Sequence, residues 1–259
     1  MAGSVDLHMP TGDAGVARWR QAQAAEARYW DGLDAAELLR IASEKPAFLA
    51  LIGPERAARL FDGNDVLEIG CGPLGLSLAS FYPNKAAIRR LVKAEPLPRR
   101  RLADTAAARA AWAAPFVRWI EAMTEEGEYL QRAGEELDAR GFDTVISYNV
   151  LDHVRDPMAV LACARAALKP GGTILVGVDC LSVAGRARFE HVTRRLARGS
   201  ILVEAHPHSF LEGQVRAMMA RAGFESVEAF GVPGAVKRWV GGSYRPAFLA
   251  RRPQTEIGS

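Results

Sequence analysis

The chain has 259 residues, of which 49% are apolar and 24% are charged, and it carries a formal net charge of +3. This balance is typical of a globular protein with a sizeable core, and so mild a positive charge does not indicate a nucleic-acid partner. Three cysteines without metal-ligand spacing suit a reducing compartment. No apolar run approaches the roughly 20 residues of a membrane helix, and we recognise no secretory signal. We therefore expect a cytoplasmic monomer or homodimer that binds neither membranes nor nucleic acids.

Residues 1–61 begin with a polar, glycine-containing stretch, residues 1–14. From about residue 15 to residue 61 the pattern is helical, rich in alanine and other good helix formers. Asp31 and Asp34 are suited to cap the second helix, and Pro46 suits the first turn of a third helix. We expect this segment to form an N-terminal helical extension or lid.

Residues 62–259 are expected to form the core domain, because short apolar runs here alternate with helical segments. The alternation predicts a parallel sheet with right-handed crossovers, and the run LGLSLASFY is expected to be the helix after the first strand. Residues 181–204 resemble an insertion. The last two strand patterns have no helix between them, which predicts a hairpin with an antiparallel edge. The expected fold is an α/β, Rossmann-like, doubly wound sheet of seven strands, mostly parallel with an antiparallel C-terminal strand, under the N-terminal helical cover.

A glycine-rich turn follows the first predicted strand, where Gly70, Gly72 and Gly75 make a G-x-G-x-x-G spacing. Glycine adopts positive φ and lets a ligand approach the backbone, at the carboxyl end of the strand. Glu95 follows Gly75 by 20 residues and ends the second predicted strand, which is the position of an acid that binds a ribose. The pattern predicts a site for an adenosine-bearing cofactor.

Two residues favour S-adenosylmethionine over a dinucleotide. Glu68 lies two residues before Gly70, where a carboxylate would repel a pyrophosphate but suit the ammonium group of S-adenosylmethionine, directly or through water. Pro73 removes a backbone N–H at the point where a pyrophosphate would need a donor.

Five stretches together resemble the class I S-adenosylmethionine-dependent methyltransferases, over roughly residues 64–180 and more faintly to the end. They are VLEIGCGPLG, LVKAEP, FDTVISYNVLDHVRDP, ALKPGGTILV and MARAGFESVE. The resemblance implies the fold and S-adenosyl-L-methionine as cofactor, with S-adenosyl-L-homocysteine as the product. It also implies cofactor-binding roles for Gly70, Cys71 and Gly72 along the methionine part, Glu95 at the ribose, Pro96 and Leu97 beside the adenine, and Asn149, Val150 and Leu151 near the transfer site.

Two further expected cofactor contacts follow the pattern of the family less closely. Where the family often has an aspartate after the third strand, this chain has Ala133, so either Glu135 or a backbone carbonyl is expected to bind the adenine amino group. Tyr29 and Trp30 lie in helices that often cover the cofactor in this family, and they either form a lid or pack between helices.

Methyl transfer needs mainly an acceptor held in line with the donor, and a catalytic base is optional. The candidate bases are His153, just after the fourth strand, and His206 and His208 in EAHPHSF. His153 could instead fix a local turn, and the other two could be loop or cap residues. Two histidines flanking a proline suggest a metal, but with no third ligand in view we expect none.

The leading hypothesis is methyl transfer from S-adenosylmethionine to an oxygen, nitrogen or carbon atom of a small-molecule acceptor by in-line displacement. Three alternatives stay open: an NAD(P)-dependent oxidoreductase that uses the same glycine loop, a non-catalytic cofactor-binding protein, and an RNA methyltransferase.

Overall fold

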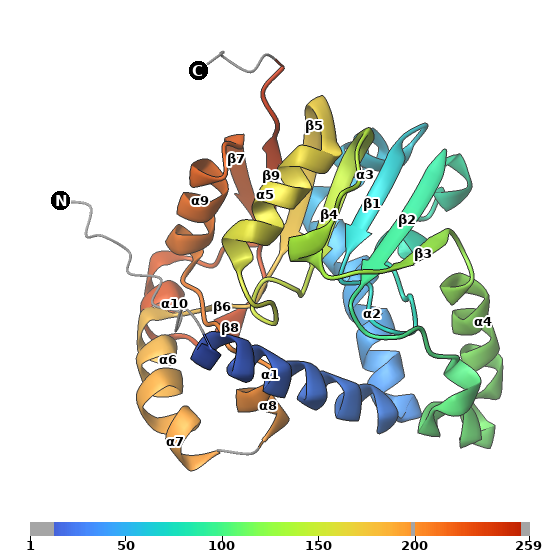
Figure 1. The fold of residues 1–259 in the computed structure, drawn as a ribbon, viewed down its shortest axis with the longest axis horizontal. Helices are drawn as coiled ribbons and strands as arrows, with labels where there is room; N and C mark the ends of the chain where they lie inside the picture. Colours follow the sequence, from blue (N-terminus) through green and yellow to red (C-terminus); the bar gives the residue numbers. More distant parts are fainter. Residues whose placement is uncertain (1–12, 198–199, 255–259) are drawn as a thin grey trace.

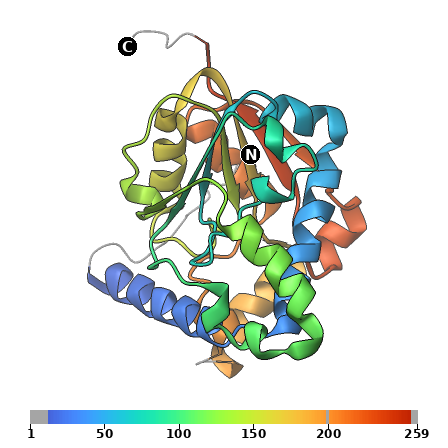
Figure 2. The ribbon, with the colours of Figure 1, turned by 90° about the vertical axis from the view of Figure 1, so that its right-hand side faces the viewer.

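The computed structural model describes residues 13–197 and 200–254, in which a seven-stranded sheet carries helices on both faces (Figure 1, Figure 2). The strand order is β3-β2-β1-β4-β5-β9-β7. The strands are β1 (Asp65–Ile69), β2 (Arg90–Glu95), β3 (Glu128–Gln131), β4 (Phe142–Tyr148), β5 (Leu168–Gly177), β7 (Glu225–Phe230) and β9 (Ala247–Arg251).

The helices come from every part of the chain. They are α1 (Asp13–Asp31), α2 (Ala35–Ile52), α3 (Pro54–Phe61), α4 (Ala114–Thr124), α5 (Pro157–Ala167), α6 (Val183–Arg188), α7 (Arg194–Leu196), α8 (Ile201–Glu204), α9 (Glu212–Arg221) and α10 (Ala235–Val240). The expected doubly wound α/β fold is therefore confirmed.

Strand β9 is antiparallel to both of its neighbours, β5 and β7, whereas the pairs among β1 to β5 are parallel. The expected antiparallel pairing of the last two strands, with an antiparallel C-terminal strand, is confirmed; within that pair β7 forms the edge of the sheet and β9 lies inside it. Burial explains the order: Phe248 and Ala250 of β9 are fully buried, while β7 has no buried residue. The short helix α10 also lies in the connection, where no helix was expected.

The N-terminal helices begin and end partly as expected. Asp34 caps α2 by accepting a hydrogen bond of 2.8 Å from the Glu37 backbone N–H, but Asp31 is the last residue of α1. Pro46 does not start a helix, because α2 continues through it to Ile52. The third helix begins only after Gly53, whose φ of 79° ends α2.

No α-helix follows β1, so the expectation of a helix over LGLSLASFY is wrong. This segment is buried along its length and contains a single 3-10 turn, Ala79–Phe81. The buried carboxylate of Glu68 accepts hydrogen bonds from the backbone N–H groups of Leu78 (2.8 Å) and Ala79 (3.3 Å). Because an acid on the strand takes these donors, the segment stays in a tight loop without leaving them unpaired.

The core has two halves, one on each face of the sheet, as the two-residue period of strands requires. Val66 and Ile146 pack with α2, α3 and α4 on one face, whereas Leu67 and Val145 pack with α5 and α9 on the other. Helices α2 and α3 thus contribute to the main core.

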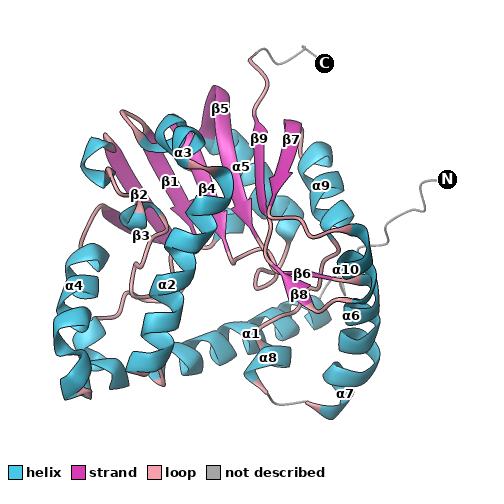
Figure 3. Ribbon diagram, turned by 180° about the vertical axis from the view of Figure 1, so that it is seen from behind, coloured by secondary structure: helices cyan, strands magenta, loops and turns pink. Residues whose placement is uncertain are grey.

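Helix α1 differs from the others because it crosses beneath the carboxyl ends of the strands (Figure 1, Figure 3). It contacts α8, which lies in the expected 181–204 insertion, and residues 1–12 of the expected extension lie outside the described residues. A two-stranded sheet of β6 (Cys180–Leu181) and β8 (Ser243–Tyr244), not expected from the sequence, ties the start of the insertion to the connection before β9. Among the described helices, none has the length and apolarity to cross a membrane.

Candidate functional site

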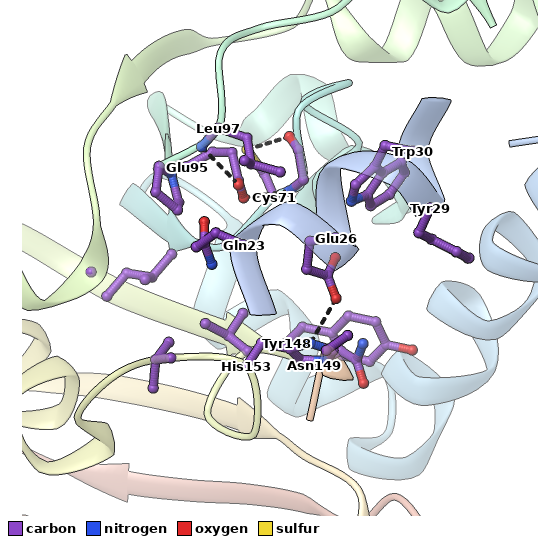
Figure 4. Close-up of a pocket in the computed structure, with 18 of the residues that line it drawn as sticks. Gln23, Glu26, Tyr29, Trp30, Cys71, Glu95, Leu97, Tyr148, Asn149 and His153 are labelled. Atoms are coloured by element: carbon purple, nitrogen blue, oxygen red, sulfur yellow. Dashed lines mark hydrogen bonds and ion pairs between the residues drawn. The ribbon is translucent and has the colours of Figure 1, made fainter. Parts of the chain in front are cut away.

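A cavity of about 300 Å³ lies between α1 and the carboxyl ends of the strands (Figure 4). Its volume is at the lower end of the range for small-molecule sites, about 300–1,000 Å³. Twelve of the residues expected in the site line it: Tyr29, Gly70, Cys71, Gly72, Glu95, Pro96, Leu97, Glu135, Asn149, Val150, His153 and His206.

The glycine loop needs glycine at each position, because Gly70, Gly72 and Gly75 have φ values of 78°, 73° and 69°. A Cβ atom on Gly70 would lie 2.2 Å from a methyl carbon of Val150, and one on Gly72 would lie 2.7 Å from the Trp30 ring. Gly75 lies away from the cavity, and its carbonyl accepts a hydrogen bond of 3.1 Å from the buried amine of Lys93.

Glu95 joins the glycine loop to the segment after β2 (Figure 4). Its carboxylate accepts hydrogen bonds from the backbone N–H groups of Gly72 (3.1 Å) and Leu97 (3.2 Å). Burial raises the pKa of Glu95 to about 7, against the opposing effect of these two bonds. Carboxylate oxygens have further lone pairs, so Glu95 can also accept hydrogen bonds from a ligand's hydroxyl groups.

Glu68 does not fit the role expected of it. Its side chain is fully buried, it does not line the cavity, and its oxygens accept the Ser77 hydroxyl and the loop N–H groups described above. The carboxylate therefore fixes the loop, and direct contact with a cofactor ammonium is not supported.

Helix α1 provides one wall of the cavity, with Trp19, Gln23, Glu26, Tyr29 and Trp30 facing it. The Tyr29 hydroxyl donates a hydrogen bond to Glu37 of α2, and its ring packs edge-to-face against Trp30 at 5.4 Å. The two aromatic residues thus both line the cavity and pack between helices.

Lys45 of α2 places a buried ammonium group at the same cavity. Within the described part of the chain it has no hydrogen bond or ion pair, and its Nζ lies 4.8 Å from the centre of the Tyr148 ring. Burial lowers the pKa of Lys45. Arg245, which also reaches the cavity, is by contrast held by Asp179 at 2.9 Å and 3.0 Å.

The loop after β4 supplies a further polar atom. Asn149 has a φ of 60°, and its side-chain oxygen is buried without a hydrogen-bond partner in the part of the chain that the structure describes. Glu135 reaches the cavity from the other side, but one of its oxygens already accepts the N–H groups of Arg155 (2.8 Å) and Asp156 (3.2 Å). Leu151 is fully buried in the core and does not line the cavity.

Two imidazoles and two carboxylates meet at one end of the cavity. His153 and His206 have ring centres 4.3 Å apart, and the Nε2 atom of each lies 3.7 Å from the Asp152 Oδ2 atom. Glu26 reaches down from α1 and places Oε1 2.7 Å from His153 Nδ1 (Figure 4).

The charges around these histidines differ. Burial disfavours the charged form of His153, but Asp152 and Glu26 outweigh burial and raise its pKa to about 9. Burial, together with the charge on His153, lowers the pKa of His206.

His208 lies apart from this group. Its Nε2 is 2.9 Å from the Val154 carbonyl oxygen, and its ring stacks on Phe210 at 5.8 Å. It faces a second chamber of about 570 Å³ beneath α6, which also has Asp152 and His206 in its wall. Of the three candidate histidines, the fold brings only His153 and His206 together.

Sequence reasoning missed Glu26, Lys45, Asp152 and Arg245. Asp152 is adjacent to His153 in the LDHV run, and that adjacency was the one usable signal. The other three lie in helices or in a late loop, where a charged residue is most often solvated.

The chain matches the family described as Methyltransferase domain over residues 40–229. Among curated proteins it is 33% identical over 116 residues to the ubiquinone biosynthesis O-methyltransferase of Cereibacter sphaeroides (strain KD131 / KCTC 12085). That match covers 44% of this chain and 41% of the relative, so the chain spans less than half of the relative's length.

Solved structures show the same fold at lower identity. The 1,6-didemethyltoxoflavin-N1-methyltransferase of Burkholderia thailandensis, solved with S-adenosylhomocysteine, has a TM-score of 0.55 and 15% identity, over 95% of this chain and 92% of that one. The [4+2]-cyclase SpnF has a TM-score of 0.51 and 17% identity, over 78% and 80%. Because the family match covers most of the chain, the protein belongs to the methyltransferase-domain family and is a class I S-adenosylmethionine-dependent methyltransferase by descent.

Proposed function

We propose that this chain transfers the methyl group of S-adenosylmethionine to a hydroxyl oxygen of a small-molecule acceptor. Bound S-adenosylmethionine supplies a methyl group activated by a positively charged sulfur. The chain's own residues have to bind that cofactor, hold the acceptor in line and keep water out.

The cavity residues fit the cofactor in three places. Glu95 offers a carboxylate for the ribose hydroxyls. Lys45, which has no hydrogen bond or ion pair among the described residues, offers a buried basic group for the carboxylate of the methionine part. The unpartnered side-chain oxygen of Asn149 is an acceptor for an ammonium group. Gly70 and Gly72 leave room where a Cβ atom would collide with the opposite wall.

The choice of cofactor depends on the hydrogen bonding and secondary structure of the glycine loop. The Gly72 N–H is already bonded to Glu95, and no α-helix starts at the loop. A pyrophosphate is usually bound by free backbone N–H groups at a helix N-terminus, where the helix dipole also favours negative charge. Without a helix N-terminus, and with the Gly72 N–H already bonded, this loop lacks the usual arrangement for a pyrophosphate, which speaks against a nicotinamide dinucleotide.

Two observations support a hydroxyl oxygen as the methyl acceptor: the position of the second chamber and the activity of the curated relative. His206 lines both the cofactor cavity and the chamber under α6, and Asp152 lines that chamber, so an acceptor there would meet the cofactor beside His206. An oxygen acceptor has to lose its proton, and carboxylate and imidazole groups are suited to receive it. The relative's printed activity is O-methylation, which agrees with this choice.

Calorimetry with S-adenosylhomocysteine, NAD⁺ and NADP⁺, followed by transfer of labelled methyl groups to a panel of hydroxylated aromatic compounds, tests the proposal. We expect binding of S-adenosylhomocysteine alone and label on an acceptor oxygen. Binding of a nicotinamide nucleotide instead would refute the cofactor. Binding without transfer to any acceptor, as a fold shared with a cyclase allows, would refute the activity.

A further inference from the structure

Three metal-ligating side chains from distant parts of the sequence converge at the junction of the two chambers. Asp152 and His153 follow β4, and His206 follows α8. One potential ligand atom from each lies within 4.8 Å of the others. We propose that Asp152, His153 and His206 bind one divalent transition-metal ion.

The three donor atoms lie close to one another. Asp152 Oδ2 lies 3.7 Å from His153 Nε2 and equally 3.7 Å from His206 Nε2. These separations are too long for hydrogen bonds. They are close to those between neighbouring ligands around one ion, because metal–ligand bonds of about 2.0–2.2 Å place the ligand atoms roughly 3–3.6 Å apart.

The burial of unpaired polar atoms supports an occupant. Asp152 is only 2% exposed, and its Oδ1 has no hydrogen-bond partner among the described residues. The Nε2 atom of His153, one of the proposed donor atoms, is also buried and has no hydrogen-bond partner among the described residues. Leaving such groups unsatisfied is costly, and an ion that binds Asp152 and both imidazoles would offset the desolvation of the carboxylate.

Glu26 completes the arrangement from α1. Its Oε1 lies 2.7 Å from His153 Nδ1, on the side of the ring away from Asp152. A proton on Nδ1 facing Glu26 leaves the lone pair of Nε2 free to bind a metal. Carboxylate, histidine and metal are commonly found in this order, because the carboxylate orients the ring and makes it a stronger ligand.

The ligand set indicates the kind of ion. Two imidazoles and one carboxylate suit Zn²⁺, Co²⁺, Mn²⁺ or Fe²⁺ better than Mg²⁺, which prefers oxygen ligands. Three protein ligands also leave coordination positions open toward both chambers, as catalytic metal sites do.

The open positions point to a class of acceptor, and this part of the inference rests on the proposed function. A molecule with two adjacent oxygen atoms can occupy two positions at once. Coordination would hold that acceptor at the boundary of the cofactor cavity and lower the pKa of its hydroxyl group.

Titration of the full chain, without a histidine tag and after treatment with EDTA, tests the site with Co²⁺ and Zn²⁺ as probes. We expect one ion per chain, with the visible absorption of Co²⁺ bound by nitrogen and oxygen ligands. Glu26→Gln should weaken affinity by about 10–100-fold, and Asp152→Asn and His206→Gln should weaken it further. His208→Gln is the matched control, because His208 is a buried histidine two residues away and outside the cluster, and its affinity should equal that of the wild type.

The outcomes separate the two proposals. Binding of S-adenosylhomocysteine by the EDTA-treated chain tests the cofactor site and the folding of each variant independently of the metal. If that binding is intact and wild type and Asp152→Asn take up Co²⁺ equally, the metal site is refuted and the proposed function is untouched. Loss of Co²⁺ binding in His208→Gln but not in His206→Gln would equally overturn the assignment.

Discussion

Replacing Glu95 by glutamine should make the chain more stable at neutral pH and at the same time weaken cofactor binding. Glutamine keeps the size of the side chain and removes the charge, and its amide nitrogen replaces one of the two oxygens that accept the Gly72 and Leu97 N–H groups. Burial raises the pKa of Glu95 from its ordinary value of 4.5 to about 7. The folded chain therefore holds this proton more tightly than the unfolded chain does.

The sign and size of the stability effect follow from that difference. The cost of burying the charged form is absent below pH 4.5, grows as the pH rises, and is complete above about pH 7. A pKa change from 4.5 to about 7 corresponds to roughly 3 kcal/mol. Relative to the wild type, the free energy of unfolding of Glu95→Gln should therefore rise by up to this amount between acid pH and about pH 7. It should start about 1 kcal/mol below the wild type at acid pH, because one of the two N–H groups loses its acceptor.

Cofactor affinity should change in the opposite direction. A hydrogen bond to a charged group contributes about 1.5–3 kcal/mol, so losing the carboxylate at the ribose should weaken binding by about 10–150-fold. The wild type itself should lose affinity as the pH falls below about 7, while the variant should not.

Urea denaturation over a pH series, together with calorimetry of S-adenosylhomocysteine, measures both effects. Glu128→Gln is the control, because Glu128 lies at the surface on the neighbouring strand β3 and pairs with Arg90 at 3.4 Å. A Glu95→Gln variant with wild-type affinity, or with the wild-type dependence of stability on pH, would show that the reasoning is wrong.

Three further substitutions test the site. The free energy of unfolding in urea should be lower for Gly70→Ala than for Gly63→Ala by about 1–3 kcal/mol. Both glycines have positive φ, but only a Cβ atom on Gly70 would clash, with Val150. Equal losses of stability in the two variants would contradict the clash. Lys45→Met should weaken S-adenosylhomocysteine binding by about tenfold or more in calorimetry, and unchanged affinity would remove the lysine from the site. Glu68→Gln should lower the free energy of unfolding by about 1–3 kcal/mol yet leave cofactor affinity within a few-fold; the reverse result would restore its direct role.

The sheet and the glycine loop could be predicted from the sequence because their signals are local. The strand ending at Glu95 is marked by its apolar run, and the positive φ of Gly70 and Gly72 by the glycines themselves. The missing helix after β1 could not be predicted, since a buried acid nine to eleven residues earlier decides it through contacts that no periodicity reveals.

Single residues near the expected site of methyl transfer could be predicted from the sequence, but their arrangement could not. His153 and His206 were each visible as candidates, but their contact depends on how the segment between β5 and α9 folds back over β4. Glu26 is separated from His153 by the whole first half of the fold and resembles any polar residue of a surface helix. Such convergence is a property of the tertiary structure.

Helix α1 supplies one wall of the cavity without belonging to the sheet, and it is held at its far side by contacts such as Arg28 with Glu204 at 2.7 Å. Mutations in this helix can therefore change the shape of the chamber while the strand ends that face the cofactor stay as they are. After gene duplication, two descendants can diverge in the molecules they accept and still share one donor, because the two halves of the binding surface are inherited on separate parts of the chain.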